Sequence, residues 1–98
     1  MNLGEVIKKL RKQTGVKQKD FASECGITPA YLSQIENNLK EPNLSTLRLI
    51  ADRLNVPMPI LLFLSLESND IMPEKQEAYK LLEPSIKNLI GNFFSDNQ

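Results

Sequence analysis

The sequence contains no histidine, no tryptophan and a single cysteine among its 98 residues. A catalytic triad built on histidine is therefore excluded, and so is a zinc site made of cysteine and histidine ligands. Neither a GxxxxGK phosphate-binding loop nor a glycine-rich dinucleotide fingerprint is present. Glu74 and Glu77 stand one helical turn apart in a polar segment, where a solvated pair is far more common than acid–base catalysis. We therefore expect no enzymatic activity, no metal and no other cofactor.

Long hydrophobic runs are also missing, because no apolar stretch approaches the roughly 18 residues that a membrane span requires. The N-terminus lacks the basic-then-apolar pattern of a secretion signal. Cys25 has no second cysteine to pair with and lies on an apolar stripe, which is typical of an inert core thiol in a reducing compartment. These features predict a cytoplasmic protein without a membrane partner.

Helical patterns fill the sequence, and no strand-like alternation of useful length interrupts them. N-cap, proline and glycine signals stand where each pattern begins or ends. With 41% hydrophobic residues, a chain of this length can bury one compact core. The first expected helix starts with Asn2 as N-cap and Glu5 three residues later, which predicts a capping box. The expected helices span residues 3–13, 18–25, 29–37, 44–54 and 58–66.

Two short amphipathic helices are predicted within residues 18–37. Ala22 lies where steeply crossing helices approach most closely, so its small side chain lets the two backbones come together. The segment therefore has the spacing of a helix-turn-helix. Each helix carries an apolar stripe that is expected to pack on the other: Phe21, Ala22 and Cys25 in the first, Leu32 and Ile35 in the second.

Three residues mark the turn between these helices. Gly26 follows the first helix, at the position where a left-handed conformation ends a helix without strain at Cβ. Thr28 offers a hydroxyl N-cap for the second helix, and Pro29 has the φ angle that a first helical position requires. The turn residues thus agree with the apolar stripes on where each helix begins and ends.

Further residues accompany this motif: Arg11, Gln18, Phe21-Ala22, Gly26, Ser33-Gln34-Ile35-Glu36, Pro42 and Leu54-Asn55-Val56. With them, roughly residues 3–64 resemble the Cro/C1-type, or XRE-type, helix-turn-helix domain of phage and bacterial repressors. The resemblance implies an all-α fold, a five-helix lambda-repressor-like DNA-binding domain with an additional C-terminal helical segment. It also implies a sequence-specific transcriptional regulator, here a dimeric repressor of a two-fold symmetric operator.

The resemblance implies that the first turns of the helix at 29–37 face the major groove of double-stranded DNA. Gln34 is the strongest candidate for a base contact, because a carboxamide can donate to and accept from adenine. The positions that match base contacts in the family are Pro29, Ala30, Ser33 and Gln34. The positions expected to contact phosphates are Lys17, Gln18, Thr28, Tyr31, Asn37, Asn38 and Lys40.

Arg11 and Glu36 stand at two positions that relatives pair across the first and third helices. The resemblance implies a structural ion pair that ties the helix at 29–37 to the body of the domain. In the alternative, both residues are ordinary exposed charges. If the pair is partly buried, removal of Glu36 would strand Arg11 and destabilise the fold.

The net charge of zero hides a division along the chain. Residues 1–40 contain seven basic and four acidic side chains, whereas residues 41–98 contain five basic and eight acidic ones. The first part therefore carries a charge of +3 and includes the helix-turn-helix, where phosphate groups would be neutralised. An imbalance of this size is equally compatible with an ordinary solvated surface, so it supports DNA binding without requiring it.

The helix at 58–66 is apolar nearly all round, so a neighbouring element is expected to cover it. Residues 78–94 form a second apolar pattern, in which Pro84 permits either one kinked helix or two helices. We therefore divide the chain into a DNA-binding domain, residues 1–66, and a helical tail, residues 67–98. The tail can fold back on the preceding helix or pack against a second subunit, and paired half-sites favour a homodimer.

The surplus apolar surface supports a second interpretation, in which the chain is a protein-binding module. An antitoxin of this kind would neutralise a partner protein through its apolar C-terminal segment. It would use the helix-turn-helix only to regulate its own synthesis, or not at all. A tight dimer without exposed apolar surface would argue against such a partner.

Overall fold

The computed structural model describes residues 1–95, and these residues are helical without any strand. The chain forms two compact units. One runs from Asn2 to Ser65, and the other consists of Met1 and the described residues from Leu66 onward. Residues 96–98 of the predicted tail lie outside the described residues. The prediction of an all-α protein is confirmed for the described chain.

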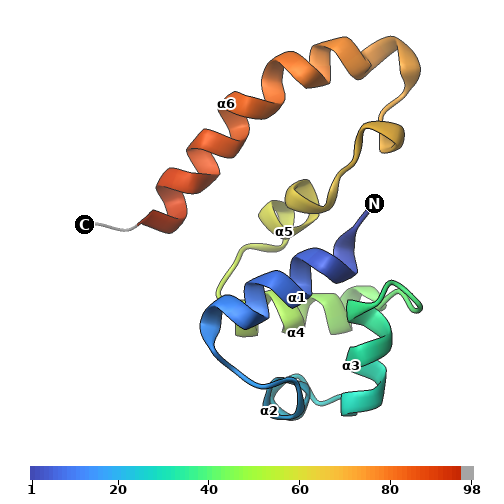
Figure 1. Ribbon diagram of the computed structural model, residues 1–98, viewed down its shortest axis with the longest axis vertical. Coiled ribbons are helices and arrows are strands. Elements are labelled where there is room, and N and C mark those ends of the chain that lie inside the picture. The colour runs from blue at the N-terminus through green and yellow to red at the C-terminus, as the bar shows by residue number, and fades with distance from the viewer. Residues whose placement is uncertain (96–98) are drawn as a thin grey trace. The chain divides into compact units, whose positions relative to one another are not determined.

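Five helices make up the first unit, in the order that Figure 1 shows. They are α1 (Leu3–Thr14), α2 (Gln18–Glu24), α3 (Pro29–Glu36), α4 (Leu44–Leu54) and α5 (Met58–Ser65). The predicted helices agree with these bounds to within one residue at each end. Since α1 packs against α3, α4 and α5 while α2 packs against α3, α1 is the helix that most of the others contact.

The end of α2 has the conformation that its glycine predicts. Gly26 has a φ angle of +69°, and its N–H donates to the carbonyl oxygen of Ser23 at 3.1 Å. The N–H of Ile27 donates to the carbonyl oxygen of Ala22 at 3.0 Å. The two bonds form a Schellman motif, which satisfies carbonyl groups that the last turn of a helix would otherwise leave unpaired.

Side-chain N-caps start two of the helices. Thr28 Oγ1 accepts a hydrogen bond from the N–H of Tyr31 at 3.0 Å, and Pro29 occupies the first helical position of α3. Asn43 Oδ1 accepts from the N–H of Thr46 at 2.8 Å at the start of α4. The predicted cap of α3 is therefore confirmed.

The predicted capping box at the start of α1 is wrong. The side-chain oxygen of Asn2 accepts from Asn38 Nδ2 at 2.8 Å instead of from a helix N–H, and Asn2 Nδ2 donates to Glu5 Oε2 at 2.9 Å. The N–H of Gly4 is satisfied by Asn38 Oδ1 at 2.8 Å. Spacing along the sequence did not reveal this cap, because the acceptor lies 34 residues away.

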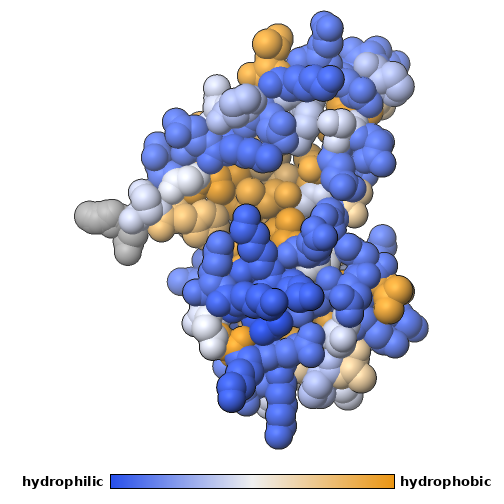
Figure 2. Space-filling view, viewed as in Figure 1, coloured by the Kyte–Doolittle hydropathy of each residue, from blue (hydrophilic) through white to orange (hydrophobic). Residues whose placement is uncertain are grey.

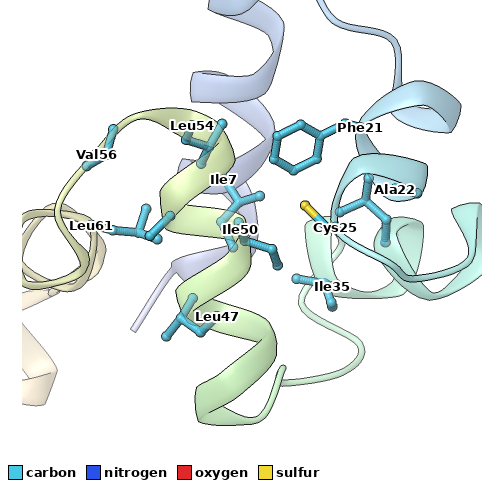
Figure 3. Packing of buried hydrophobic residues seen from close by; sticks show 12 residues of the cluster. Ile7, Phe21, Ala22, Cys25, Ile35, Leu47, Ile50, Leu54, Val56 and Leu61 are labelled. Atoms are coloured by element: carbon cyan, nitrogen blue, oxygen red, sulfur yellow. The ribbon is translucent and has the colours of Figure 1, made fainter.

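Side chains from all five helices of this unit meet in one hydrophobic core, shown in Figure 3. Each helix contributes at least one large side chain that is 0 or 1% exposed: Ile7, Phe21, Leu32, Ile50 and Leu61. Burial of a side chain of this size contributes about 1.5–3 kcal/mol, so no helix can leave the unit without a large loss of stability. The two apolar stripes predicted for the helix-turn-helix are confirmed, because all five of their residues are buried.

The second unit is dominated by α6 (Gln76–Ser95), which follows two short 3-10 turns, Ser68–Asp70 and Pro73–Lys75. Pro84 lies inside α6, so the structure has one helix where the sequence left one or two open. None of the described helices is long and apolar enough to cross a membrane. Figure 2 shows apolar side chains at the surface of this unit, and its exposed large hydrophobic residues from Leu66 onward are Met72, Leu81, Leu82, Leu89, Phe93 and Phe94.

Candidate nucleic-acid interface

The two faces of α3 differ in burial. Leu32, Ile35 and Glu36 attach the helix to the rest of the unit and are 0, 1 and 2% exposed. Residues three and four apart share a face of a helix, so the remaining positions form one continuous surface. That surface contains the four residues predicted to contact bases, of which Ser33 is half-buried and the others are exposed: Pro29, Ala30, Ser33 and Gln34.

This surface carries neutral groups rather than charges. Gln34 presents an exposed carboxamide. The carboxamide of Asn37 lies beside the hydroxyl of Ser33, because Asn37 Nδ2 donates to Ser33 Oγ at 3.4 Å. The one charged residue of α3, Glu36, is buried on the other face. Such a surface can contact base edges through hydrogen bonds and methyl groups, whereas phosphate neutralisation requires residues around it.

The residues predicted to contact phosphates lie around α3 in the chain. Lys17 and Gln18 lie at the start of α2, and Thr28 and Tyr31 lie at the start of α3. The other three, Asn37, Asn38 and Lys40, follow the C-terminal end of α3. The exposed ones are Lys17, Thr28, Asn37, Asn38 and Lys40, and the half-buried ones are Gln18 and Tyr31. Lys17 is the N-cap residue of α2 but cannot cap it through its side chain, because an ammonium group has no hydrogen-bond acceptor.

A buried ion pair joins α1 to α3. Arg11 Nε donates to Glu36 Oε2 at 2.6 Å, and Arg11 Nη2 donates to Glu36 Oε1 at 3.0 Å. Arg11 Nη1 also donates to the carbonyl oxygen of Val16 at 2.9 Å, in the loop before α2. Gln18 Nε2 donates to Glu36 Oε1 at 3.0 Å. Because Glu36 is bonded to both α1 and α2, this network fixes the orientation of α3 within the unit.

Sequence reasoning missed two features of the site. It assigned Gln18 to phosphate contact alone, and it assigned no role to Gly4. The side-chain nitrogen of Gln18 carries two N–H groups, and the bond to Glu36 uses only one of them. No local pattern indicates either bond, because Gln18 and Glu36 are 18 residues apart and Gly4 and Asn38 are 34 residues apart. A glycine in the first turn of a helix was the one sequence signal of close backbone approach.

The single cysteine lies in the core behind the site. Cys25 is 2% exposed at the end of α2. Burial raises the pKa of its thiol from 9.0 to about 11, although the nearby charge of Arg53 acts in the opposite direction. The thiol therefore stays protonated and unreactive at neutral pH, as expected of a core cysteine.

The helix-turn-helix family matches this chain over residues 7–61, which include most of α1, all of α2, α3 and α4, and part of α5. The matched region contains the turn, the buried ion pair and the exposed face of α3. The chain belongs to the helix-turn-helix family of the Cro/C1 type. This is a family of DNA-binding transcriptional regulators and not of enzymes, so both the resemblance and the expected lack of catalysis are confirmed.

Relatives of this Cro/C1-type chain include two proteins of Bacillus phage phi105. Its immunity repressor protein is 29% identical over 97 residues, covering 87% of this chain and 67% of the phage protein. The ImmF control region 10 kDa protein is 39% identical over 59 residues, covering 60% of this chain and 66% of its own length. The HTH-type transcriptional regulator SutR of Escherichia coli K12 is 42% identical over 55 residues, 56% of this chain. This chain spans about two thirds of the phage proteins and 31% of SutR.

Two solved structures resemble the chain in fold. The P22 c2 repressor in complex with a synthetic operator matches with a TM-score of 0.59 and 26% identity, over 62% of this chain and 92% of the repressor. The clp gene regulator ClgR from Corynebacterium glutamicum matches with a TM-score of 0.66 and 24% identity, over 86% of this chain and 89% of ClgR. The expected lambda-repressor-like fold is confirmed.

Proposed function

We propose that this chain is a sequence-specific transcriptional repressor that inserts α3 into the major groove of double-stranded DNA in the cytoplasm. The observation that carries this proposal is the exposed face of α3, whose hydrogen-bonding side chains are held in place by the buried Arg11–Glu36 pair. The P22 c2 repressor, solved with a synthetic operator, supports the same use of this fold. The similarity to an immunity repressor supports repression rather than activation.

Base recognition in this proposal depends chiefly on Gln34. Its exposed carboxamide can form two hydrogen bonds with the major-groove edge of adenine. Ser33 can bond to either kind of base, and the methyl group of Ala30 can contact a thymine methyl. Pro29 has no N–H donor, so it would contribute shape but no hydrogen bond.

Phosphate contacts would hold α3 in the groove. Lys17 and Lys40 supply positive charge, and the first 40 residues carry +3 overall. The neutral donors would fix the register of the helix without selecting a sequence. These donors are Gln18, Thr28, Tyr31, Asn37 and Asn38.

We take residues 1–66 as the DNA-binding domain and residues 67–98 as a tail that forms a homodimer. Leu82, Leu89 and Phe93 in α6 are 58, 66 and 55% exposed. They belong to an apolar seam along α6, formed by Tyr79, Leu82, Ile86, Leu89 and Phe93. These residues follow one another at alternating intervals of three and four, which is the spacing of helices that pair side by side. A second copy of α6 offers the same seam, so the contact would be self-complementary.

Selection of bound duplexes from a random DNA library, at about 0.15 M salt, tests the proposal, because this ionic strength suppresses weak phosphate-only binding. We expect enrichment of a two-fold symmetric site with half-sites about one helical turn apart. Enrichment of a single half-site would support base recognition and contradict the dimer. Absence of any enrichment would contradict sequence-specific recognition.

Two exposed side chains of α6 favour a second candidate function, the antitoxin that binds a partner protein. Leu81 and Phe94 are 80 and 42% exposed and lie off the seam, so pairing along the seam would leave them uncovered. A protein partner could cover this surface. Binding of a hydrophobic dye to the purified chain tests this function. A dimer that binds no dye would contradict it, and solubility only with a co-expressed neighbouring gene product would support it.

A further inference from the structure

Asn38 closes the C-terminal end of α3. Its backbone is left-handed, with a φ angle of +59°, and its N–H donates to the carbonyl oxygen of Ile35 at 3.0 Å. The N–H of Leu39 donates to the carbonyl oxygen of Gln34 at 2.8 Å. These bonds form a Schellman motif, in which asparagine occupies the position that most often holds glycine. The last turn of α3, including the backbone of Gln34, is thereby fixed to Asn38.

The side chain of Asn38 leaves α3 and caps α1. Its Oδ1 accepts from the N–H of Gly4 at 2.8 Å, and its Nδ2 donates to Asn2 Oδ1 at 2.8 Å. A Cβ atom at Gly4 would lie 2.2 Å from the carbonyl oxygen of Ile35 and 2.6 Å from Asn38 Oδ1. Because no other residue permits this approach, the start of α1 and the end of α3 are in direct backbone contact.

Asn2 extends this contact to a third helix end. Its backbone N–H donates to the carbonyl oxygen of Ser65 at 2.7 Å. Ser65 is fully buried at the end of α5, where its Oγ donates to the carbonyl oxygen of Leu61 at 2.8 Å. The ends of α3 and α5 are thus both bonded to the first residues of α1, and we call this set of contacts the Asn38 junction.

We propose that Asn38 is a positioning residue for DNA recognition. Through the Asn38 junction it holds the last turn of α3, and with it Gln34, in the orientation that contact with bases requires. Arg11 holds the same helix through the side chain of Glu36, whereas Asn38 holds its backbone end. This role rests on the proposed function. For Asn38 it replaces the phosphate contact named there, because Oδ1 and Nδ2 of its side chain are both bonded within the domain.

The variant Asn38→Gly isolates the contribution of the Asn38 side chain. Because glycine adopts the left-handed conformation freely, the variant loses only the two side-chain hydrogen bonds. Asn55→Gly is the matched control, since Asn55 has a φ angle of +62° at the end of α4. Two quantities are measured for each full-length variant. One is the amide hydrogen exchange of Gly4 in the free protein, and the other is the Kd for the selected duplex at about 0.15 M salt.

In Asn38→Gly we expect exchange at Gly4 to be about tenfold faster and the Kd to rise about 5–10-fold, the effect of losing one or two net hydrogen bonds. Asn55→Gly should change neither quantity. Asn2→Ala removes the second partner of Asn38 and should also weaken binding. The double variant Asn2→Ala/Asn38→Gly should bind within about twofold of Asn38→Gly, because both changes break the same junction.

Unchanged exchange at Gly4 in Asn38→Gly would overturn the proposal. A second pattern would also overturn it. If Asn2→Ala binds DNA with wild-type affinity while Asn38→Gly binds weakly, the Asn38 amide contacts a phosphate directly. If the wild-type chain binds no duplex, the proposed function fails and this role fails with it. The exchange rate of Gly4 would then still report whether the junction forms, so the two failures are distinguishable.

Discussion

Arg11 and Glu36 form a two-bond ion pair that attaches α3 to α1. Their side chains are 8 and 1% exposed, and the Nε–Oε2 distance is 2.6 Å. Further hydrogen bonds to Val16 and Gln18 leave the charged groups well paired. A buried pair of this kind need not add stability relative to an apolar pair, but neither partner can be removed without leaving a buried charge alone.

We predict that Glu36→Ala lowers the free energy of unfolding by about 3–5 kcal/mol, because the Arg11 guanidinium loses its counter-ion in a buried position. Urea unfolding followed by circular dichroism measures this change. The control is Glu24→Ala, which removes an exposed carboxylate from α2 and should alter stability by less than about 0.5 kcal/mol. Equal stabilities for the two variants would show that the pair does not hold α3.

Replacement of Gln34 by alanine should cost about 1–3 kcal/mol of binding free energy on the cognate duplex and relax the preference at one base pair. Because Gln34 is exposed, the variant should keep the thermal stability of the wild type. Titrations against cognate and random duplexes measure the effect, with the exposed Gln13→Ala of α1 as control. The same loss on both duplexes would remove Gln34 from base recognition.

The buried thiol of Cys25 predicts a pH dependence of stability. Its pKa is raised from 9.0 to about 11 in the folded chain, so between these values the unfolded state loses a proton that the folded state keeps. Stability should therefore fall as the pH rises from about 9 toward 11, with no contribution from this group below that range. Urea unfolding at about pH 8 and about pH 10.5 measures the decrease.

Cys25→Ala is the matched variant, because lysine and tyrosine groups also titrate in this range. Below about pH 9 it should be less stable than the wild type through lost packing, and its decrease with pH should be shallower than that of the wild type. Parallel decreases in the two proteins would mean that the thiol does not contribute.

Two leucines of α6 test the dimer. Leu89 lies on the apolar seam and Leu81 lies off it, although both are exposed, at 66 and 80%. Leu89→Asp should raise the dissociation constant of a homodimer by at least about tenfold, because a charge would be buried in the contact. Leu81→Asp should leave it unchanged. Sedimentation equilibrium distinguishes them, and equal effects of the two substitutions would contradict pairing along the seam.

Much of the helical unit could be predicted because its signals are local. The bounds of α1 to α5 were placed within one residue, since residues such as Gly26, Thr28 and Pro29 select helix ends through their own backbone preferences. The residues of the α3 surface were predicted on a resemblance, and helical spacing then put them on one face. The sequence did not decide whether the tail forms one helix or two, because a proline such as Pro84 can either end a helix or lie within one. In the structure α6 continues through Pro84.

The amino-acid sequence alone determined the positions of the helices, their apolar stripes and the turn between α2 and α3. These features depend on residues close together in the chain, because backbone conformation responds mainly to sequence neighbours. The partners of Gly4 and of Glu36 depended instead on the fold. Asn38 reaches Gly4 across 34 residues and Gln18 reaches Glu36 across 18. A buried polar group takes whichever partner packing brings within about 3 Å, so only the tertiary structure decided that Asn38, and not Asn2, caps α1.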